Sequence, residues 1–408
     1  LMKSIRNKLS LATCSLLTTG NAAAEAIENA WDVDSSYLYY SEEDRVTVNK
    51  LVGSAKGFVS PKNTAAIKVV FDAMSGATPT GAVKSGNPLT STGASGGTGI
   101  GGSTAAAPLA DFNDTRVGVS VDWKHDHSRT FNMNYNGAFS VENDYESLSA
   151  AATANKETAN RATKFTLGVA FTFDTIFRTG ARTTPEPLSR VSDDLYRGEG
   201  ERATTDLIAG VTRVINRRTV AQINLAAGIA NGYMTDPYKV FSVVDANGIE
   251  WDQYYEGRPD SRTRWSITAK LNHQLFPSNH NMHLAYRYYS DDWDIQSHTL
   301  DYKHRFNMWS GNYLEPRIRL YTQTEAEFYQ NSFFADPTAG DPSLPQYLSA
   351  DYRLDQMSSA TAGFTWGKHF SSDSDLRARL EYMYQSFENS EFETNKAIIF
   401  QISYGKRF

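Results

Sequence analysis

The feature that most limits the fold of this sequence is an alternation of apolar and polar residues that recurs along most of its length. Residues 131–135, for example, read Phe-Asn-Met-Asn-Tyr, and similar alternation is found at 116–123, 164–174 and 282–289. Successive side chains of a β-strand point to opposite faces, so each segment predicts a strand with one apolar and one polar face. Repeated segments of this kind are typical of a barrel whose outer face meets lipid and whose inner face lines a polar lumen. The sequence therefore predicts an all-β fold, a transmembrane antiparallel up-and-down β-barrel.

The composition agrees with membrane-spanning strands rather than helices. The 408 residues have a mean hydropathy of -0.47 and a formal net charge of -6, and they contain no apolar run long enough for a transmembrane helix. Aromatic residues make up 12% of the chain, and Tyr and Phe account for most of them. The one cysteine, Cys14, lies in the first segment of the chain, so the mature protein is expected to have no disulfide and no cysteine-bound metal.

The start of the sequence predicts export from the cytoplasm. A basic stretch, Met2 to Lys8, precedes a modestly apolar stretch, Leu9 to Leu17, and small residues follow at Ala22 to Ala26. This order is that of a secretory signal peptide. We expect a signal peptide over 1–26 and a single domain over 27–408.

The end of the sequence predicts a closing strand. Residues 396–408 alternate throughout, and Ile398, Phe400 and Tyr404 share a face with the terminal Phe408. A terminal aromatic residue on such a strand resembles the signal by which outer-membrane barrels are recognised for assembly. The alternative is an edge strand of a soluble β-sandwich.

The lengths of the connections predict the number of strands. Outer-membrane barrels keep short turns on the periplasmic side and long loops outside. The long segments here are 76–113, 175–201, 233–259 and 326–349, and residues 85–110, rich in Gly, Ser and Thr, are expected to form an external loop or a partial plug. Placing all short turns on one side gives about sixteen strands and leaves both termini in the periplasm. The expected strands are 35–41, 45–56, 64–75, 114–124, 129–142, 145–156, 161–174, 202–214, 218–232, 261–275, 280–290, 295–306, 311–325, 350–370, 375–387 and 395–408.

Several strings in this order resemble one family of Gram-negative outer-membrane proteins, which is catalogued only as a domain of unknown function. The strings are Phe71 to Gly81 (FDAMSGATPTG), Ser140 to Tyr145 (SVENDY), Asp236 to Lys239 (DPYK), Arg258 to Arg262 (RPDSR), Tyr286 to Trp293 (YRYYSDDW) and Tyr347 to Tyr352 (YLSADY). The resemblance implies an outer-membrane barrel and transfers no activity. Because members of that family often accompany thioredoxin-like and flavin-transferase proteins, it also implies an association with envelope redox proteins.

Basic residues gather on the predicted lumen face of the C-terminal half. A barrel of about sixteen strands is wide enough for an aqueous channel unless loops fill it. Guanidinium groups on its wall would favour anions such as carboxylates and phosphates. Alternatively, these residues pair with the lumen carboxylates Asp301, Glu315 and Glu381 and only support the wall. The candidate wall residues are Arg264, Lys270, Arg287, Lys303, Arg305, Arg317, Arg319, Arg377 and Arg379.

Two proline-containing motifs bracket the long external loop at 233–259. Proline restricts the backbone there, and the opposite charges of each motif could fix the loop over the barrel mouth. Such a loop would constrict the pore, form a receptor surface, or simply be anchored. The candidate anchors are Asp236, Lys239, Arg258, Asp260 and Arg262.

Motifs for catalysis and cofactor binding are not found. The histidines have no zinc-ligand spacing, and neither a nucleophile turn nor a haem-attachment motif occurs. We therefore expect no catalytic residue, cofactor or metal site. The first functional hypothesis is a pore or transporter for small anionic solutes. The second is a scaffold barrel that holds partners of an envelope redox or electron-transfer system. The third, less favoured by the sequence, is an outer-membrane enzyme whose active-site residues come from different strands. The expected partners are outer-membrane lipid and the barrel-assembly machinery, with no nucleic acid.

Overall fold

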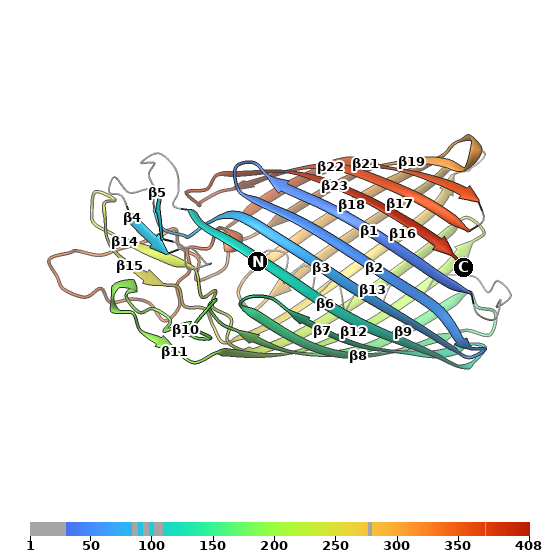
Figure 1. Ribbon diagram of the computed structural model, residues 1–408, viewed down its shortest axis with the longest axis horizontal. Helices are drawn as coiled ribbons and strands as arrows, with labels where there is room; N and C mark the ends of the chain where they lie inside the picture. Colours follow the sequence, from blue (N-terminus) through green and yellow to red (C-terminus); the bar gives the residue numbers. More distant parts are fainter. Residues whose placement is uncertain (1–29, 84–88, 93–97, 102–108, 276–279, 372) are drawn as a thin grey trace.

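The computed structural model describes residues 30–83, 89–92, 98–101, 109–275, 280–371 and 373–408. The expected signal peptide over 1–26 and most of the Gly-rich segment 85–110 lie outside these residues. The described chain forms a closed antiparallel barrel of sixteen strands (Figure 1). The predicted fold class and strand number are therefore confirmed.

The barrel strands follow one another around the wall in chain order. They are β1 (Trp31–Glu42), β2 (Val46–Ser60), β3 (Asn63–Pro79), β6 (Leu109–Ser128), β7 (Phe131–Val141), β8 (Tyr145–Glu157), β9 (Thr163–Ile176), β12 (Gly200–Asn216), β13 (Thr219–Gly232), β16 (Ser261–Leu275), β17 (His280–Asp291), β18 (Gln296–Asn307), β19 (Asn312–Gln323), β21 (Met357–Ser371), β22 (Ser374–Phe387) and β23 (Thr394–Arg407).

The first and last strands close the barrel. β1 pairs with β23 from Asp32 opposite Arg407 to Glu42 opposite Ala397. At the seam, the main-chain N–H of Trp31 donates to the carbonyl of Phe408 at 3.1 Å, and that of Phe408 donates to Trp31 at 2.9 Å. In the described part of the chain every barrel strand is thus paired with a neighbour on each side, as a membrane-spanning sheet requires.

One expected strand begins later than the alternation predicts. The segment 350–370 was expected to be extended throughout, but pairing with β19 starts at Met357, opposite Gln323. The preceding residues form the short 3-10 helix η3 (Tyr352–Leu354), because the Asp351 side chain accepts a hydrogen bond from the main-chain N–H of Arg353 at 3.1 Å. This local capping bond competes with the strand.

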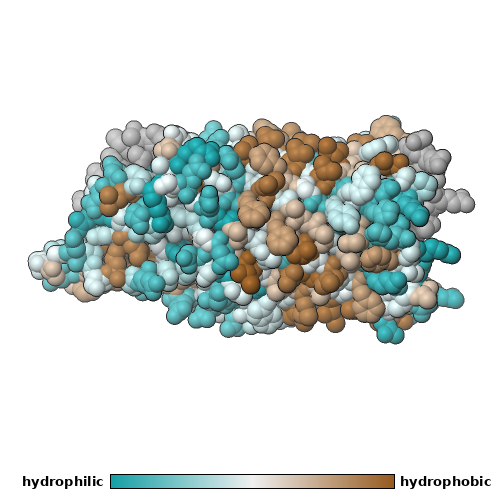
Figure 2. All heavy atoms as spheres, turned by 90° about the horizontal axis from the view of Figure 1, so that it is seen from below, coloured by the Kyte–Doolittle hydropathy of each residue, from teal (hydrophilic) through white to brown (hydrophobic). Residues whose placement is uncertain are grey.

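The outer face of the strands carries the apolar residues. Figure 2 shows a hydrophobic band across the middle of the barrel on the face in view, with more hydrophilic surface toward both ends. The band residues remain exposed because in a membrane they meet lipid rather than water. Among the most exposed are Leu51, Phe139, Leu148, Leu167, Phe173, Leu207, Ile223, Leu225, Ile318 and Ile398. Separately, none of the helices in the described part of the chain has the length and apolar character that a membrane crossing requires.

The two ends of the barrel differ. We call the end with short connections, where β1 begins and β23 ends, the turn end, and the opposite end the loop end (Figure 1). At the loop end, small sheets project beyond the barrel. They comprise β4 (Leu89–Thr92) with β5 (Thr98–Gly101), β10 (Thr184–Pro185) with β11 (Tyr196–Arg197), and β15 (Glu250–Tyr255) with β14 (Val240–Val244) and β20 (Ser332–Phe334). The short 3-10 helix η1 (Val191–Asp193) also lies in a loop, whereas η2 (Trp309–Gly311) is at the turn end.

Two long loops, 233–260 and 324–356, pack against each other, and we call them together the cap. One apolar cluster in the cap contains Phe241, Val243 and Leu348, all fully buried. A second joins Phe328 and Leu354 to the β17–β18 connection through Trp293, whose ring meets that of Phe328 at 5.1 Å. The cap is therefore a packed structure with its own core.

Candidate functional site

All nine basic wall residues lie on strands β16 to β22, on the face opposite the exposed apolar residues. On β19, for example, Ile318 and Leu320 are exposed to the outside, and Arg317 and Arg319 alternate with them. The nine residues therefore line one side of the lumen. They fall into three sets of three, which differ in the groups that they contact.

Three of the nine are paired with carboxylates. Arg317 contacts both Asp301 and Glu381, the latter at 3.1 Å. Arg264 pairs with Asp206 at 2.9 Å. Near the turn end, Arg377 contacts Asp34 at 2.6 Å and Asp375 at 2.9 Å. These arginines support the wall, as the simpler interpretation of the sequence expects.

Three others have no such partner. Within the described residues, Lys303, Arg305 and Arg379 have no carboxylate within 4.0 Å. Arg305 donates to Asn307 at 3.2 Å, and its guanidinium lies 3.5 Å from the centre of the Tyr313 ring. The remaining three, Lys270, Arg287 and Arg319, make other polar or ring contacts. The wall on β18 to β22 therefore keeps positive charge that its own carboxylates do not neutralise.

The opposite wall is lined by small side chains. A cavity of about 70 Å³ lies against β6 to β9. Lys68 and Arg116 are at its edge, and Arg116 lies 3.7 Å from Glu142. The lumen therefore has one basic wall and one small, mostly neutral wall. The small residues that line the cavity are Gly118, Ser120, Ala138, Ser140, Ser147, Ser149, Ala151, Ala170 and Thr172.

Side chains pack more densely at the loop end of the lumen than at the turn end. Lumen-facing residues at the loop end are almost fully buried, with relative exposures of 4% for Asp72, 6% for Met357 and 1% for Asn395. At the turn end, the side chains of Asp34 and Arg407 are 50% and 48% exposed. Lumen-facing side chains are thus more accessible at the turn end.

A cluster of buried charges holds the cap in place. Arg353 pairs with Asp236 at 2.7 Å and with Asp351, and Arg258 pairs with Asp351 at 2.7 Å. Lys239 connects the cap to the barrel, because its ammonium group donates to Thr78 at 3.2 Å and to the carbonyl of Pro79 at the end of β3. The cap is therefore tied to the rim by Lys239, which is buried, and is held together by ion pairs that are mostly buried.

The protonation of this cluster follows from its charges. Burial opposes ionisation of Asp236, but the positive charges of Arg353 and Lys239 outweigh it and hold the pKa of that carboxyl below its usual value. Burial raises the pKa of Glu256, although Arg258 is 2.7 Å away. Burial also lowers the pKa of Lys239. Breaking any one pair would leave a buried charge without its partner.

The structure separates the five candidate loop anchors. Asp236, Lys239 and Arg258 all belong to the buried cluster. Arg262 lies outside it, where it pairs with Asp291 and stacks 4.2 Å from the Trp293 ring. Asp260 differs from the expectation, because its side chain is exposed and only its carbonyl is used, as acceptor for the Gly232 N–H at 2.7 Å.

Sequence analysis missed three members of the cluster. Glu256, Asp351 and Arg353 contact the anchors, but Asp351 and Arg353 come from a different loop. The motif Tyr347 to Tyr352 resembles the family but indicates no role by itself. Its Asp351 acquires a role in anchoring the cap only because the loop 324–356 packs against the loop that carries Arg258.

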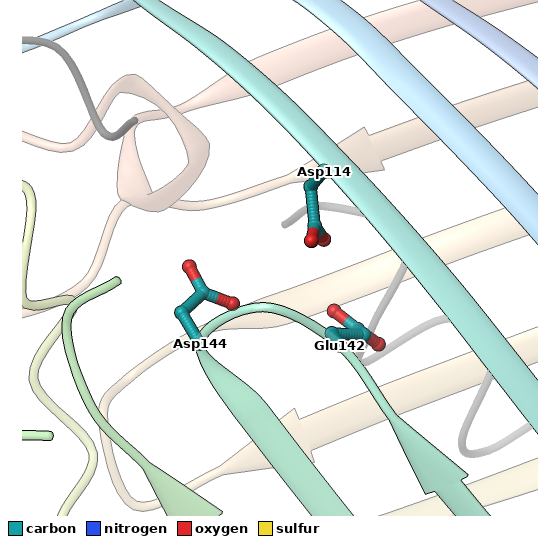
Figure 3. Close-up of side chains that lie close together, drawn as sticks. All are labelled: Asp114, Glu142 and Asp144. Atoms are coloured by element: carbon teal, nitrogen blue, oxygen red, sulfur yellow. The ribbon is translucent and has the colours of Figure 1, made fainter. Parts of the chain in front are cut away.

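Three carboxylates converge beside the β7–β8 connection (Figure 3). The possible ligand oxygens of Asp114, Glu142 and Asp144 lie within 4.8 Å of one another. Asp114 accepts a hydrogen bond from the Asn143 N–H at 3.1 Å. Burial, together with the negative charges of Asp114 and Glu142, raises the pKa of Asp144 to about 7.

This acidic group could offer oxygen ligands to a cation, although Ca²⁺ takes six to eight of them. Sequence analysis did not find it, because β6 supplies Asp114 while Glu142 and Asp144 lie on the next connection. The pairing of β6 with β7 ends at Val117 opposite Val141, but β6 extends further toward the loop end. Asp114, on this extension, therefore lies beside the β7–β8 connection.

The closed barrel, its outward apolar band and its polar lumen define a transmembrane β-barrel of porin-like architecture. The chain belongs to the family described as "Protein of unknown function (DUF3570)", whose profile matches residues 6–398. The resemblance inferred from the sequence motifs is thus confirmed. No curated protein matches the chain.

Among solved structures, the barrel is similar to a bacterial polysaccharide outer-membrane secretin, with a TM-score of 0.49, 8% identity, and coverage of 94% of this chain and 99% of that chain. It is also similar to Pseudomonas aeruginosa OpdK with vanillate, with a TM-score of 0.43, 7% identity and coverage of 93% and 98%. A third similar structure is Pseudomonas aeruginosa OccK2 in complex with glucuronate, with a TM-score of 0.42, 9% identity, and coverage of 94% of this chain and 100% of that chain.

Proposed function

We propose that this protein is a gated pore for small anionic solutes in the outer membrane of a Gram-negative cell, reached through a cleaved signal peptide, with the turn end in the periplasm. The observation that carries the proposal is the group Lys303, Arg305 and Arg379, which face the lumen with no carboxylate within 4.0 Å among the described residues. Charged groups on a pore wall attract ions of the opposite sign. The group therefore favours anions.

The arrangement of the lumen supports passage beside this wall. Arg317 is neutralised by Asp301 and Glu381, so it shapes the wall without adding free charge. The small side chains of β6 to β9 leave space opposite the basic residues. A solute with a carboxylate or phosphate group could contact the guanidinium of Arg379 while the rest of it passes the neutral side.

The cap makes the proposed pore a gated one. In the arrangement described here, passage requires the cap to move away from the rim at Thr78 and Pro79. The buried ion pairs of Asp351 oppose that movement. We therefore expect low conductance of the unmodified protein and higher conductance when the cluster is broken.

The test is the conductance and ion selectivity of purified protein in planar bilayers. We use Asp351→Asn to loosen the cap and add Lys303→Gln, Arg305→Gln and Arg379→Gln in that background. The Asp351→Asn variant should conduct with a preference for anions. Adding the three glutamine substitutions should reduce or reverse that anion preference. Lys368→Gln is the matched control, because Lys368 is on the lipid-facing side of β21.

A second function, the scaffold barrel, is supported by the dense packing of the cap, in which Phe241, Val243 and Leu348 are fully inaccessible. If neither the unmodified protein nor the loosened variant conducts and a partner protein remains bound on purification, the scaffold replaces the pore. Envelope redox proteins are then the first candidates for the partner. We propose no enzymatic role in either case.

A further inference from the structure

An apolar groove crosses the lipid-facing side of β7, β8 and β9. It encloses about 540 Å³. Phe139, Leu148 and Phe171 form its walls, and each is roughly half exposed. Its floor is low because Gly137 and Ala150 are paired opposite each other. These strands lie along the lower edge of Figure 1, and the face seen from below in Figure 2 carries the hydrophobic band.

The line of small side chains on β8 continues from the groove toward the turn end. Ala152 lies between Tyr135 and Val169, and Ala154 lies between the next pair of larger residues. The line ends at Lys156, whose side chain is exposed.

The length of this line matches one leaflet of a bilayer. Strands rise about 3.3 Å per residue, so the six steps from Ala150 to Lys156 cover about 20 Å along the strand. With a tilt of about 40° from the membrane normal, this corresponds to roughly 15 Å of depth, half of a hydrocarbon core about 30 Å thick. A lipid chain lying from Lys156 inward would therefore end in the groove near the bilayer centre.

Cations border the end of the line. Lys156 has no carboxylate within 4.0 Å in the described part of the chain, and it contacts only Thr130, at 3.3 Å, and the Phe131 ring, at 5.9 Å. Arg161 lies on the adjoining β8–β9 connection and pairs only loosely with Glu157, at 3.8 Å. Arg213 on β12 is exposed two strands away, or about 10 Å. The turn-end border of this face is thus positively charged, although the whole chain carries a formal charge of -6.

We propose that this face binds one anionic glycerophospholipid from the leaflet at the turn end. An acyl chain occupies the groove and the line of alanines, and the headgroup phosphate lies at Lys156, within reach of Arg161 and Arg213. Apolar contact with the chain and attraction of the phosphate by basic side chains both favour binding. The site depends on the barrel lying in a membrane, and it is independent of whether the lumen conducts.

The test is native mass spectrometry of detergent-purified protein, titrated with phosphatidylglycerol and, separately, with zwitterionic phosphatidylcholine of the same chains. Phosphatidylglycerol should give a one-lipid complex that phosphatidylcholine gives only weakly. Lys156→Gln should weaken phosphatidylglycerol binding about fivefold, the effect expected for one basic residue at a lipid surface. Ala152→Phe should block the line of small side chains between the groove and Lys156 and weaken binding of both lipids.

The matched control lies on the opposite side of the barrel. Lys368 is a lipid-facing lysine near the turn end of β21, and it also lies beside a phenylalanine ring, that of Phe370 at 5.3 Å. Lys368→Gln should leave phosphatidylglycerol binding unchanged. Equal weakening by Lys156→Gln and Lys368→Gln, equal retention of the two lipids, or retention of lipopolysaccharide in place of phospholipid would each overturn the proposal. Heat-dependent gel mobility checks that every variant is folded. A Lys156→Gln variant that loses lipid binding but conducts like the unmodified protein would show that the lipid site is separate from the pore.

Discussion

Arg317 on β19 and Glu381 on β22 form an ion pair of 3.1 Å although a whole strand, β21, lies between them. The residue of β21 in register with both is Gly363. With no side chain at that position, Glu381 can lie across the strand and reach the arginine. The pair therefore links three strands of the wall instead of two.

A second ion pair spans a glycine of the intervening strand, on the other side of the basic wall. Asp206 on β12 pairs with Arg264 on β16, and Gly228 of the intervening β13 is in register with both. A Cβ atom added to Gly228 would lie 2.2 Å from the Asp206 carboxylate. Gly228 and Gly363 thus leave space on the lumen face, so that residues two strands apart can form ion pairs across them.

Replacing Gly363 by alanine should destabilise the barrel. The new Cβ atom would lie 2.2 Å from the Leu380 carbonyl oxygen and 2.7 Å from Cγ of Glu381, so main chain and side chain must both move. We expect a loss of about 2 to 4 kcal/mol in the free energy of unfolding, measured by urea denaturation in detergent, because a buried charge pair is disturbed. Gly53→Ala is the control, since nothing lies within 4 Å of its added Cβ atom. Equal effects of the two substitutions would contradict the role assigned to Gly363.

Replacing Asp351 by asparagine should release the cap. Arg258 and Arg353 would both lose a buried partner, which costs about 3 to 5 kcal/mol. Limited proteolysis should then cut residues 324–356 faster while the barrel keeps its heat-modifiable mobility. Asp260→Asn, a change at an exposed side chain, should leave cleavage unaffected. Unchanged cleavage in Asp351→Asn would show that the apolar clusters alone hold the cap.

The sequence allows prediction of the barrel because a period of two is a local property of each strand. Phe139 and Ser140 point to opposite faces whatever strand lies beside them. The pairing of residues across loops is not local. Nothing in the pattern near Asp236 indicates Arg353 as its partner, and nothing near Glu381 indicates that a glycine on the next strand allows it to reach Arg317. Hence the orientation of the wall residues and the carboxylates Asp301 and Glu381 beside them could be inferred from the sequence, whereas the exact pairing of these residues and the cluster of the cap could not.

Removing Phe408 should affect assembly more than stability. Its side chain is 66% exposed, and Phe408 adds one pair of main-chain hydrogen bonds with Trp31 to a long β1–β23 seam. The free energy of unfolding of refolded protein without Phe408 should therefore differ by no more than about 1 kcal/mol from that of the unmodified chain. Its insertion into membranes in cells should fall, as measured by the fraction recovered in the outer membrane. Normal insertion would argue against Phe408 as an assembly signal.

The acidic group at the β7–β8 connection should make stability depend on pH. The pKa of Asp144 is raised to about 7 by burial and by Asp114 and Glu142, so the folded protein holds this proton more tightly than the unfolded chain does. Its contribution to stability is fully present below the ordinary aspartate pKa and is lost as pH rises to about 7 and above. Unfolding free energies at pH 5 and pH 8 should therefore differ less in Asp144→Asn than in the unmodified protein. Asp193→Asn, at an exposed residue of η1, should keep the original difference. If Asp144→Asn kept the difference as well, Asp144 would not be the group that makes stability depend on pH.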